Sequence, residues 1–226
     1  MPTNSHDKVP VITLERLATY LRYLVDLQQD NVETISSSEV EEQTGINAAQ
    51  FRKDLSYFGE FGKPGVGYNV ADLHSRIAYI LKLDKEQRVI LVGAGNLGSA
   101  LVGYPGLKEH RFNVVAVYDN NVAKIGRNLW DFEIMDFGRI VETNALHNAR
   151  IAIVAVPRSA AQAVTDKLIE VGIKAILNFA PTVLRVPEHV VVRNVSFIQE
   201  LAVLSYHLSH EDEENKSSSK SPKQTS

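Results

Sequence analysis

The spacing of hydrophobic positions changes near residue 80 of the chain. Before that point, apolar residues recur every three or four positions, as they do on one face of an amphipathic helix. Thr13 is expected to cap the first such helix. The apolar stripe of this helix consists of Leu14, Leu17, Ala18, Leu21, Leu24 and Val25. The N-terminal part of the chain is therefore predicted to be helical.

Two shorter helices are predicted next, separated by Gly45. Serines at 36–38 precede a run of acidic residues, which is the pattern of a capped helix start. The next helix is expected to run from Asn47 through Tyr57. Together the two helices and their glycine-containing turn predict a helix-turn-helix. The glycine-rich segment that follows predicts a tight β-hairpin over 59–70, which would be the wing of a winged helix.

After residue 88 the apolar residues form short runs without polar alternation, separated by helical patterns such as 160–171. Strands of this kind predict a parallel sheet that is covered on both faces. The runs are Val89–Val92, Val114–Tyr118, Ile151–Val156, Ala175–Leu177 and Val190–Val192. The chain therefore divides into a winged helix-turn-helix domain over 1–80 and an α/β domain with a Rossmann-type, doubly wound parallel sheet over 81–195.

A glycine-rich segment stands between the first predicted strand of this sheet and the next helix. It has the G-x-G-x-x-G spacing of dinucleotide-binding loops, in which backbone amides bind the pyrophosphate. Asp119 ends the second strand, 21 residues after the last glycine of the loop, where a carboxylate can bind the ribose hydroxyls and repel a 2′-phosphate. NAD(H) is therefore expected rather than NADP(H). The loop consists of Gly93, Ala94, Gly95, Asn96, Leu97 and Gly98.

Composition and charge narrow the function further. The chain has 226 residues, no cysteine and a net charge of −3. Disulfides, thiolate metal sites and cysteine nucleophiles are excluded, and no other metal site is predicted. With no overall positive charge, any contact with nucleic acid must come from a local patch. Neither a signal peptide nor a run of membrane-spanning length is present, so a soluble cytoplasmic protein is expected.

The chain offers a dinucleotide site without an evident reaction. A dehydrogenase needs a positioned acid or base, and none of the seven histidines falls clearly at the end of a predicted strand. The protein is therefore predicted not to be an enzyme. Two alternatives stay open, an NAD-dependent oxidoreductase with a helical N-terminal appendage and a CoA-binding domain of the ligase type.

The second helix of the helix-turn-helix carries side chains that can reach phosphates or base edges, and Lys63 lies on the predicted wing. Basic residues beside Asp54 could equally form a surface ion-pair set. The side chains of the second helix that are able to reach DNA are Gln50, Arg52, Lys53, Ser56 and Tyr57.

Over roughly residues 10–208 the sequence resembles one family, the Rex redox-sensing transcriptional repressors. The segments that carry the resemblance are Arg52–Gly62 (RKDLSYFGEFG), Gly65–Tyr68 (GVGY), the Gly93–Gly98 loop, Tyr104–Gly106 (YPG), Val156-Pro157 and Leu177–Pro181 (LNFAP). The resemblance implies a homodimer that binds a palindromic operator in double-stranded DNA and releases it when NADH replaces NAD+.

The resemblance also implies roles for single residues. The helix at 196–210 resembles one that is exchanged between subunits, so that Phe197 would enter the partner's nicotinamide pocket beside Tyr104. Arg22 matches an arginine that links the DNA-binding domain to Tyr104, and Ser196 stands where some relatives have an aspartate that pairs with that arginine. Residues 211–226 are expected to be a disordered tail. With the resemblance, the cofactor set also takes in Asn120, Pro157 and Phe179, and the DNA-binding set takes in Phe51 and Asp54.

Overall fold

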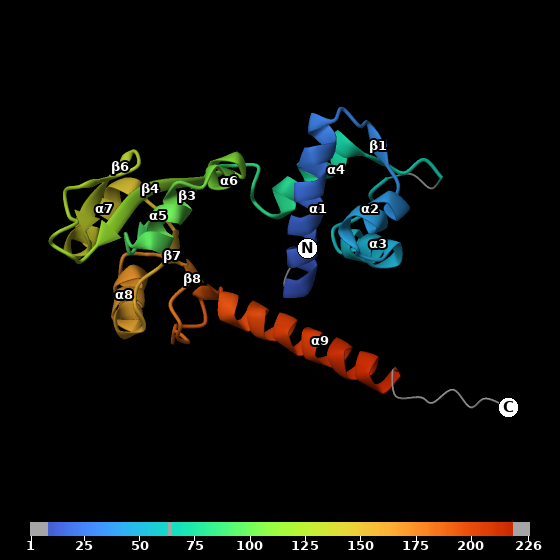
Figure 1. Cartoon of the computed structure of the whole chain (residues 1–226). Helices are drawn as coiled ribbons and strands as arrows, with labels where there is room; N and C mark the ends of the chain where they lie inside the picture. Colours follow the sequence, from blue (N-terminus) through green and yellow to red (C-terminus); the bar gives the residue numbers. More distant parts are fainter. Residues whose placement is uncertain (1–8, 63–64, 219–226) are drawn as a thin grey trace. The chain divides into compact units, whose positions relative to one another are not determined.

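The computed structural model describes residues 9–62 and 65–218, with side chains as far as residue 208. The chain separates between Glu86 and Gln87 into two compact units, whose elements are labelled in Figure 1. The boundary predicted after residue 80 is too early, because Leu81 and Leu83 still pack against the N-terminal core. Lys63 and the end of the chain after 218 lie outside the described residues.

The N-terminal unit contains the predicted helix-turn-helix. The Glu39 amide donates to Ser36 Oγ, and the Ser36 amide donates back to Glu39 Oε2, so a capping box fixes the start of the first of its two helices. Gly45, at φ 69°, ends that helix, and Asn47 caps the next. The elements are α1 (Val11–Gln29), β1 (Thr34–Ile35), α2 (Ser37–Thr44), α3 (Ala48–Ser56), β2 (Tyr68–Asn69) and α4 (Val70–Ile80).

Two details of the N-terminal unit differ from the prediction. In the described part of 59–67 there is no strand, and β2 instead pairs antiparallel with β1, so the predicted hairpin is wrong. The glycines there allow positive φ angles in a loop, and the pairing partner lies far away in sequence. Thr13 does not cap α1, because Pro10 does; Thr13 is buried and its hydroxyl donates to Asp54 Oδ1.

The second unit is built on one sheet with the strand order β5-β6-β4-β3-β7-β8-β9. All neighbouring strands are parallel except β5 and β6, which are antiparallel. The parallel order, with β3 in the middle and the chain winding outwards to either side, is that of a Rossmann sheet. The strands are β3 (Gln87–Val92), β4 (Phe112–Asp119), β5 (Asn128–Leu129), β6 (Phe132–Asp136), β7 (Ile151–Val154), β8 (Ala175–Asn178) and β9 (Val191–Asn194).

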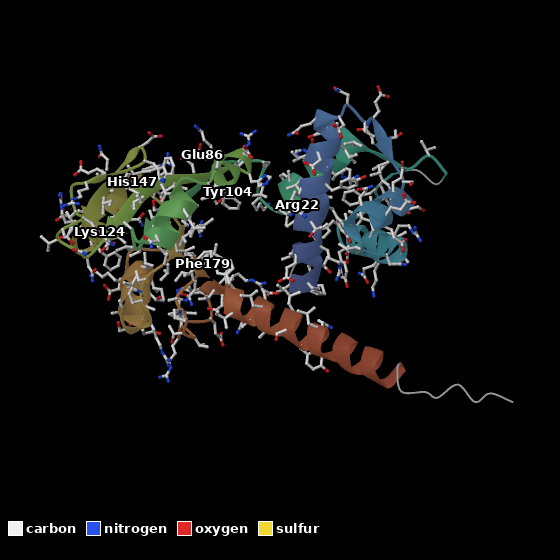
Figure 2. All side chains as sticks on the ribbon, viewed as in Figure 1. Arg22, Glu86, Tyr104, Lys124, His147 and Phe179 are labelled. Carbon is white, nitrogen blue, oxygen red and sulfur yellow. The ribbon has the colours of Figure 1, made fainter. Side chains whose placement is uncertain are left out.

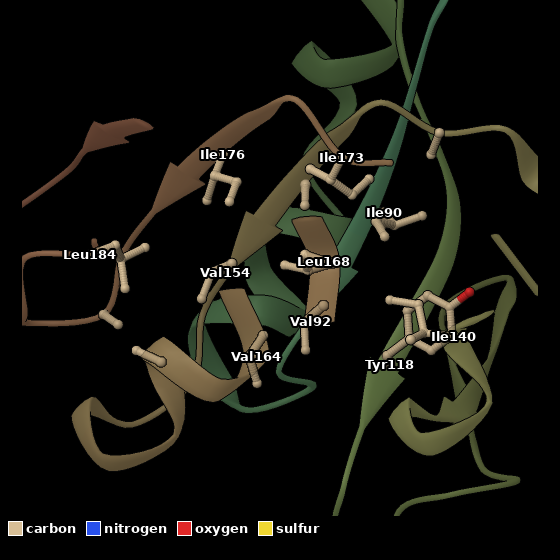
Figure 3. Close-up of a cluster of buried hydrophobic side chains, with 14 of the residues drawn as sticks. Ile90, Val92, Tyr118, Ile140, Val154, Val164, Leu168, Ile173, Ile176 and Leu184 are labelled. Atoms are coloured by element: carbon tan, nitrogen blue, oxygen red, sulfur yellow. The ribbon is translucent and has the colours of Figure 1, made fainter. Parts of the chain in front are cut away.

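Helices cover both faces of this sheet, as the unalternating strands predict. On one face Ile90 and Val92 of β3 pack with Ile140 and Leu168, which belong to α7 and α8 (Figure 3). On the other face Val89 and Leu91 pack with residues of α5 and α6. The helices are α5 (Asn96–Val102), α6 (Pro105–Glu109), α7 (Ile140–His147) and α8 (Arg158–Glu170), with a short 3₁₀ turn at Phe137–Arg139.

The last helix, α9 (Phe197–Ser218), is longer than expected. Residues 211–218 belong to it, so the prediction of a disordered tail is wrong for that stretch. Its Glu and Lys residues have high helix propensity, and a charged run can extend a helix without burying anything. Among the described residues no helix is long and apolar enough to cross a membrane.

Candidate nucleotide site and nucleic-acid-binding helix

The three glycines of the Gly93–Gly98 loop have three different surroundings. Gly93 adopts a φ of +106°, and a Cβ there would collide with the carbonyl oxygen of Ala155. A Cβ at Gly98 would collide with the carbonyl oxygen of Gly93, so the start of α5 lies directly against the end of β3. At Gly95 there is no heavy atom within 4 Å of the Cβ position. The loop therefore packs closely against backbone at Gly93 and Gly98 and is open at Gly95, where a pyrophosphate can approach it.

Asp119, at the end of β4, is joined to this loop. Its Oδ2 accepts the Ala94 amide at 2.9 Å and Lys124 Nζ at 3.0 Å, while Oδ1 accepts the Asn121 amide at 2.8 Å. Burial alone would raise the pKa of Asp119, but these donors together hold that pKa below its ordinary value. The carboxylate is therefore ionised, and part of its hydrogen-bonding capacity holds the loop.

A cleft of about 580 Å³ lies beside the loop, at the carboxyl ends of β3, β4 and β7. This is the place where ligands bind to open parallel sheets. The structure brings seven of the predicted cofactor residues to its lining. They are Gly93, Gly95, Asn96, Leu97, Asp119, Asn120 and Pro157.

A second cleft, of about 640 Å³, lies next to it between the ends of β8 and β9 and the first turn of α9. Leu97 lines both clefts, so they meet at the start of α5. Phe179 and Phe197 line the second cleft with their ring centres 6.3 Å apart, and Figure 2 shows Phe179 beside the start of α9. Ser196 lies in the same lining. The second cleft thus places two aromatic rings next to the first cleft.

Some predicted cofactor and switch residues are not in these linings. Ala94 and Gly98 are buried in the loop itself. Tyr104 lines neither cleft; 60% of it is exposed, and its ring lies where a Cβ at Gly106 would be. Arg22 is exposed on α1 (both are labelled in Figure 2), and its pairing with Tyr104 stays a prediction.

Helix α3 presents part of the predicted DNA-binding set to solvent. Arg52, Lys53, Ser56 and Tyr57 are exposed, and Arg52 Nη1 donates to Ser37 Oγ at 2.6 Å, which connects α3 with the start of α2. A basic side chain can therefore reach a duplex from this face without crossing the core.

Two members of the predicted set do not face a duplex. Phe51 and Asp54 are 0% exposed, so their assignment as DNA contacts is wrong. Phe51 packs edge-on against Tyr20 and Tyr68 in the core. Asp54 is surrounded by donors, one of which is the half-buried amide of Gln50 at 2.8 Å. The two assignments treated all sides of the helix alike, whereas one face of any packed helix must turn inwards.

Known proteins resemble both units. The family described as "Putative DNA-binding protein N-terminus" matches residues 8–56, and that described as "CoA binding domain" matches residues 84–182. A "Redox-sensing transcriptional repressor Rex" from Pelotomaculum thermopropionicum is 47% identical over 201 residues, which is 89% of this chain and 94% of the relative. The chain belongs to the Rex family of redox-sensing transcriptional repressors.

Further Rex relatives support the same assignment. The repressor from Carboxydothermus hydrogenoformans is 44% identical over 89% of this chain and 97% of its own length. Among solved structures, RSP in complex with β-NAD+ and operator DNA is 38% identical, with a TM-score of 0.86 over 95% of this chain and 99% of that one. RSP in complex with β-NADH is 37% identical, with a TM-score of 0.83 over 92% and 98%. These relatives are repressors, not dehydrogenases or CoA ligases.

Lys124 was not predicted from the sequence as a direct partner of the Asp119 carboxylate. Phe137 and Ser159, which line the first cleft, were not predicted either. Ser159 follows Pro157 closely at the start of α8, so the strand-to-helix junction after β7 was an available signal. Among the residues that the structure describes, no histidine or tyrosine lines either cleft.

Proposed function

We propose that this chain binds NAD+ and NADH in the two joined clefts. The adenosine and pyrophosphate would lie along the first cleft, against Gly95 and Asp119. The nicotinamide would reach the second cleft beside Phe179. The support is the open backbone at Gly95, the shared lining by Leu97, and the NAD+ and NADH complexes of RSP.

The N-terminal unit would bind an operator through α3. Its exposed basic residues lie on the second helix of a helix-turn-helix, the position that enters the major groove in proteins with this motif. The strongest support is the complex of RSP with operator DNA, since this chain resembles RSP over nearly its whole length. Arg52 and Lys53 would contact phosphates or base edges, together with Ser56, Tyr57 and Lys63.

The protein would act as a homodimer joined by α9. The first three turns of this helix expose apolar side chains, which a lone soluble chain rarely does over so long a stretch. The partner subunit would cover them by exchange of the helix, placing Phe197 against the partner's nicotinamide site. The exposed residues are Phe197, Ile198, Leu201, Val203, Leu204, Tyr206 and Leu208, each more than half exposed.

The oxidation state of the nicotinamide would decide whether the dimer holds DNA. A ligand shifts an equilibrium between two arrangements only by its different affinity for them. NAD+ and NADH differ at the nicotinamide, so the selective contacts would lie there, near Phe179 and the partner's Phe197. Tyr104, which lines neither cleft in the single chain, would join them only as the resemblance implies. Because Ser196 is neutral, Arg22 would have one charge partner fewer than in relatives with an aspartate there. The protein would act in the cytoplasm, where it can meet both DNA and the cellular NAD(H) pool.

Operator selection tests this function. A pool of random duplexes is bound to the protein in the presence of NAD+, and the bound sequences are read. We expect a two-fold symmetric consensus whose half-sites are about one helical turn apart or a multiple of it. Binding that shows no sequence preference, or turnover of NADH with small carbonyl compounds, would contradict the proposal and favour the oxidoreductase.

A further inference from the structure

The most completely bonded buried charge in the described part of the N-terminal unit is the carboxylate of Asp54 on α3. It is 0% exposed, yet it accepts hydrogen bonds from four side chains. Arg16 donates to both of its oxygens, from Nε at 2.6 Å and from Nη2 at 2.7 Å. Tyr20 donates at 2.9 Å, Gln50 at 2.8 Å and Thr13 at 3.3 Å. Asp54 is therefore not a surface charge. Its carboxylate and these donors form a hydrogen-bonded junction between α3 and α1.

Three of the four donors come from one face of α1. Thr13, Arg16 and Tyr20 are spaced three and four residues apart, so they lie in one row along that helix. Burial alone would raise the pKa of Asp54, but hydrogen bonds from Arg16, Gln50 and Tyr20 hold that pKa below its ordinary value. The carboxylate thus stays ionised, and the charge is compensated only while α3 keeps its place on α1.

The geometry of this junction restricts rotation of α3 as well as its distance from α1. A two-pronged arginine bond fixes the plane of the carboxylate, which a single donor would not do. Successive side chains turn by about 100° around a helix, so Arg52 and Ser56 point away from Asp54, on the opposite side of α3. A rotation of α3 at the junction would therefore shift Arg52 and Ser56 on its opposite side.

We propose that Asp54 is a positioning residue for DNA binding: through Arg16 and Tyr20 it sets the rotation of α3 on α1 and so aims Arg52 and Ser56 at the operator. This inference rests on the proposed binding of an operator by α3. Buried ion pairs contribute little net stability compared with apolar replacements, but they can select one arrangement among several. Binding sites need such support, because their groups must be held to within about 0.5 Å.

The test compares Asp54→Asn with Asp30→Asn, which removes an exposed carboxylate at the end of α1. Operator and random-sequence duplexes are titrated with the full-length protein in NAD+, well below the melting temperature of each variant. We expect Asp54→Asn to lose about tenfold or more of its preference for operator over random DNA, and Asp30→Asn to keep it. NADH affinity, measured on the same samples, should stay unchanged because the nucleotide site belongs to the other unit.

Other outcomes would overturn the inference. An Asp54→Asn protein that melts earlier but keeps its operator preference would show a role in stability alone. Tighter binding to both duplexes would show that the carboxylate faces phosphates. If Asp54→Asn does not fold, Arg16→Lys keeps the charge but not the two-pronged bond, and it should lose operator preference in the same direction; an unchanged preference would contradict the inference. A wild-type protein that binds no operator would instead refute the proposed function.

Discussion

The carboxylate of Asp119 accepts the backbone amide of Ala94 at 2.9 Å, so the end of β4 holds the glycine-rich loop that follows β3. The same oxygen accepts Lys124 Nζ, which leaves the carboxylate partly neutralised. Asp119 therefore has two roles in the proposed site. It shapes the loop that would bind pyrophosphate, and its remaining acceptor capacity faces the cleft in which the ribose would lie.

Replacement of Asp119 by alanine should weaken the binding of NADH and of NAD+ to the same extent. We expect NADH and NAD+ each to lose about tenfold or more in affinity, since hydrogen bonds to a charged group are lost at the end of the ligand that the two share. The titration can follow energy transfer to NADH from Trp130, the single tryptophan of the chain. Operator binding without nucleotide should be intact.

Asp131→Ala is the control for this substitution, because Asp131 is exposed at the turn between β5 and β6. It should leave both affinities unchanged. A selective loss of NADH with normal NAD+ binding in Asp119→Ala would contradict the assignment of Asp119 to the adenosine end.

Two glycine substitutions should separate packing from ligand contact. Gly98→Ala places a methyl group against the carbonyl oxygen of Gly93, so we expect a loss of about 1–3 kcal/mol in the free energy of unfolding as well as weak NADH binding. Gly95→Ala places its methyl group in open space and should weaken NADH binding while the melting temperature stays near the wild-type value. Equal melting temperatures for the two variants would contradict this division of roles.

Arg52→Ala should weaken binding to the selected operator. If Arg52 reaches a phosphate, the dependence of log affinity on log salt concentration should become shallower by about one unit; if it reads a base, specificity at one position should relax. Lys174→Ala removes an exposed positive charge from the other unit and should change neither quantity. Unchanged operator affinity for Arg52→Ala across several salt concentrations would refute its assigned role.

The double substitution Leu201→Asp and Leu204→Asp should separate the proposed dimer. Each of these side chains is 59% exposed on α9, and a carboxylate in a covered apolar interface is costly. Light scattering should give half the wild-type mass, and operator affinity should fall with it. Leu146→Asp on α7, where the leucine is 82% exposed, should keep the wild-type mass. A double variant with unchanged mass would contradict a dimer joined through α9.

Local signals in the sequence were sufficient for much of the fold. The serines at 36–38 predicted a capped helix start, Gly45 predicted the end of that helix, and the Gly93–Gly98 loop was predicted between a strand and a helix. The structure has all three features, with Ser36 as the cap and Gly45 in the left-handed region. The buried strands of the sheet were equally readable, since short apolar runs on both sides of a helical pattern are typical of a parallel sheet.

The errors arose where distant residues decide the structure. Threonine is a residue type that often caps helices, but the Thr13 hydroxyl donates to Asp54, 41 residues away in sequence. The strand at Tyr68–Asn69 pairs with Thr34–Ile35 and not within its own segment. Helix α4 is a different case, because its cap Asn69 and its apolar residues Leu73 and Ile77 are local signals. The glycine cluster before it was instead interpreted as part of a hairpin. No local pattern in the sequence indicates the bond between Thr13 and Asp54 or the pairing of β2 with β1.

The most direct test of the account uses the selected operator, wild-type protein and the two nucleotides added separately. Fluorescence anisotropy of the labelled duplex gives the apparent Kd at saturating NAD+ and at saturating NADH. We expect NADH to raise this Kd by about 5- to 150-fold over the value in NAD+, the usual range for coupling between two sites. An operator that stays bound with the same Kd in NADH as in NAD+ would contradict it.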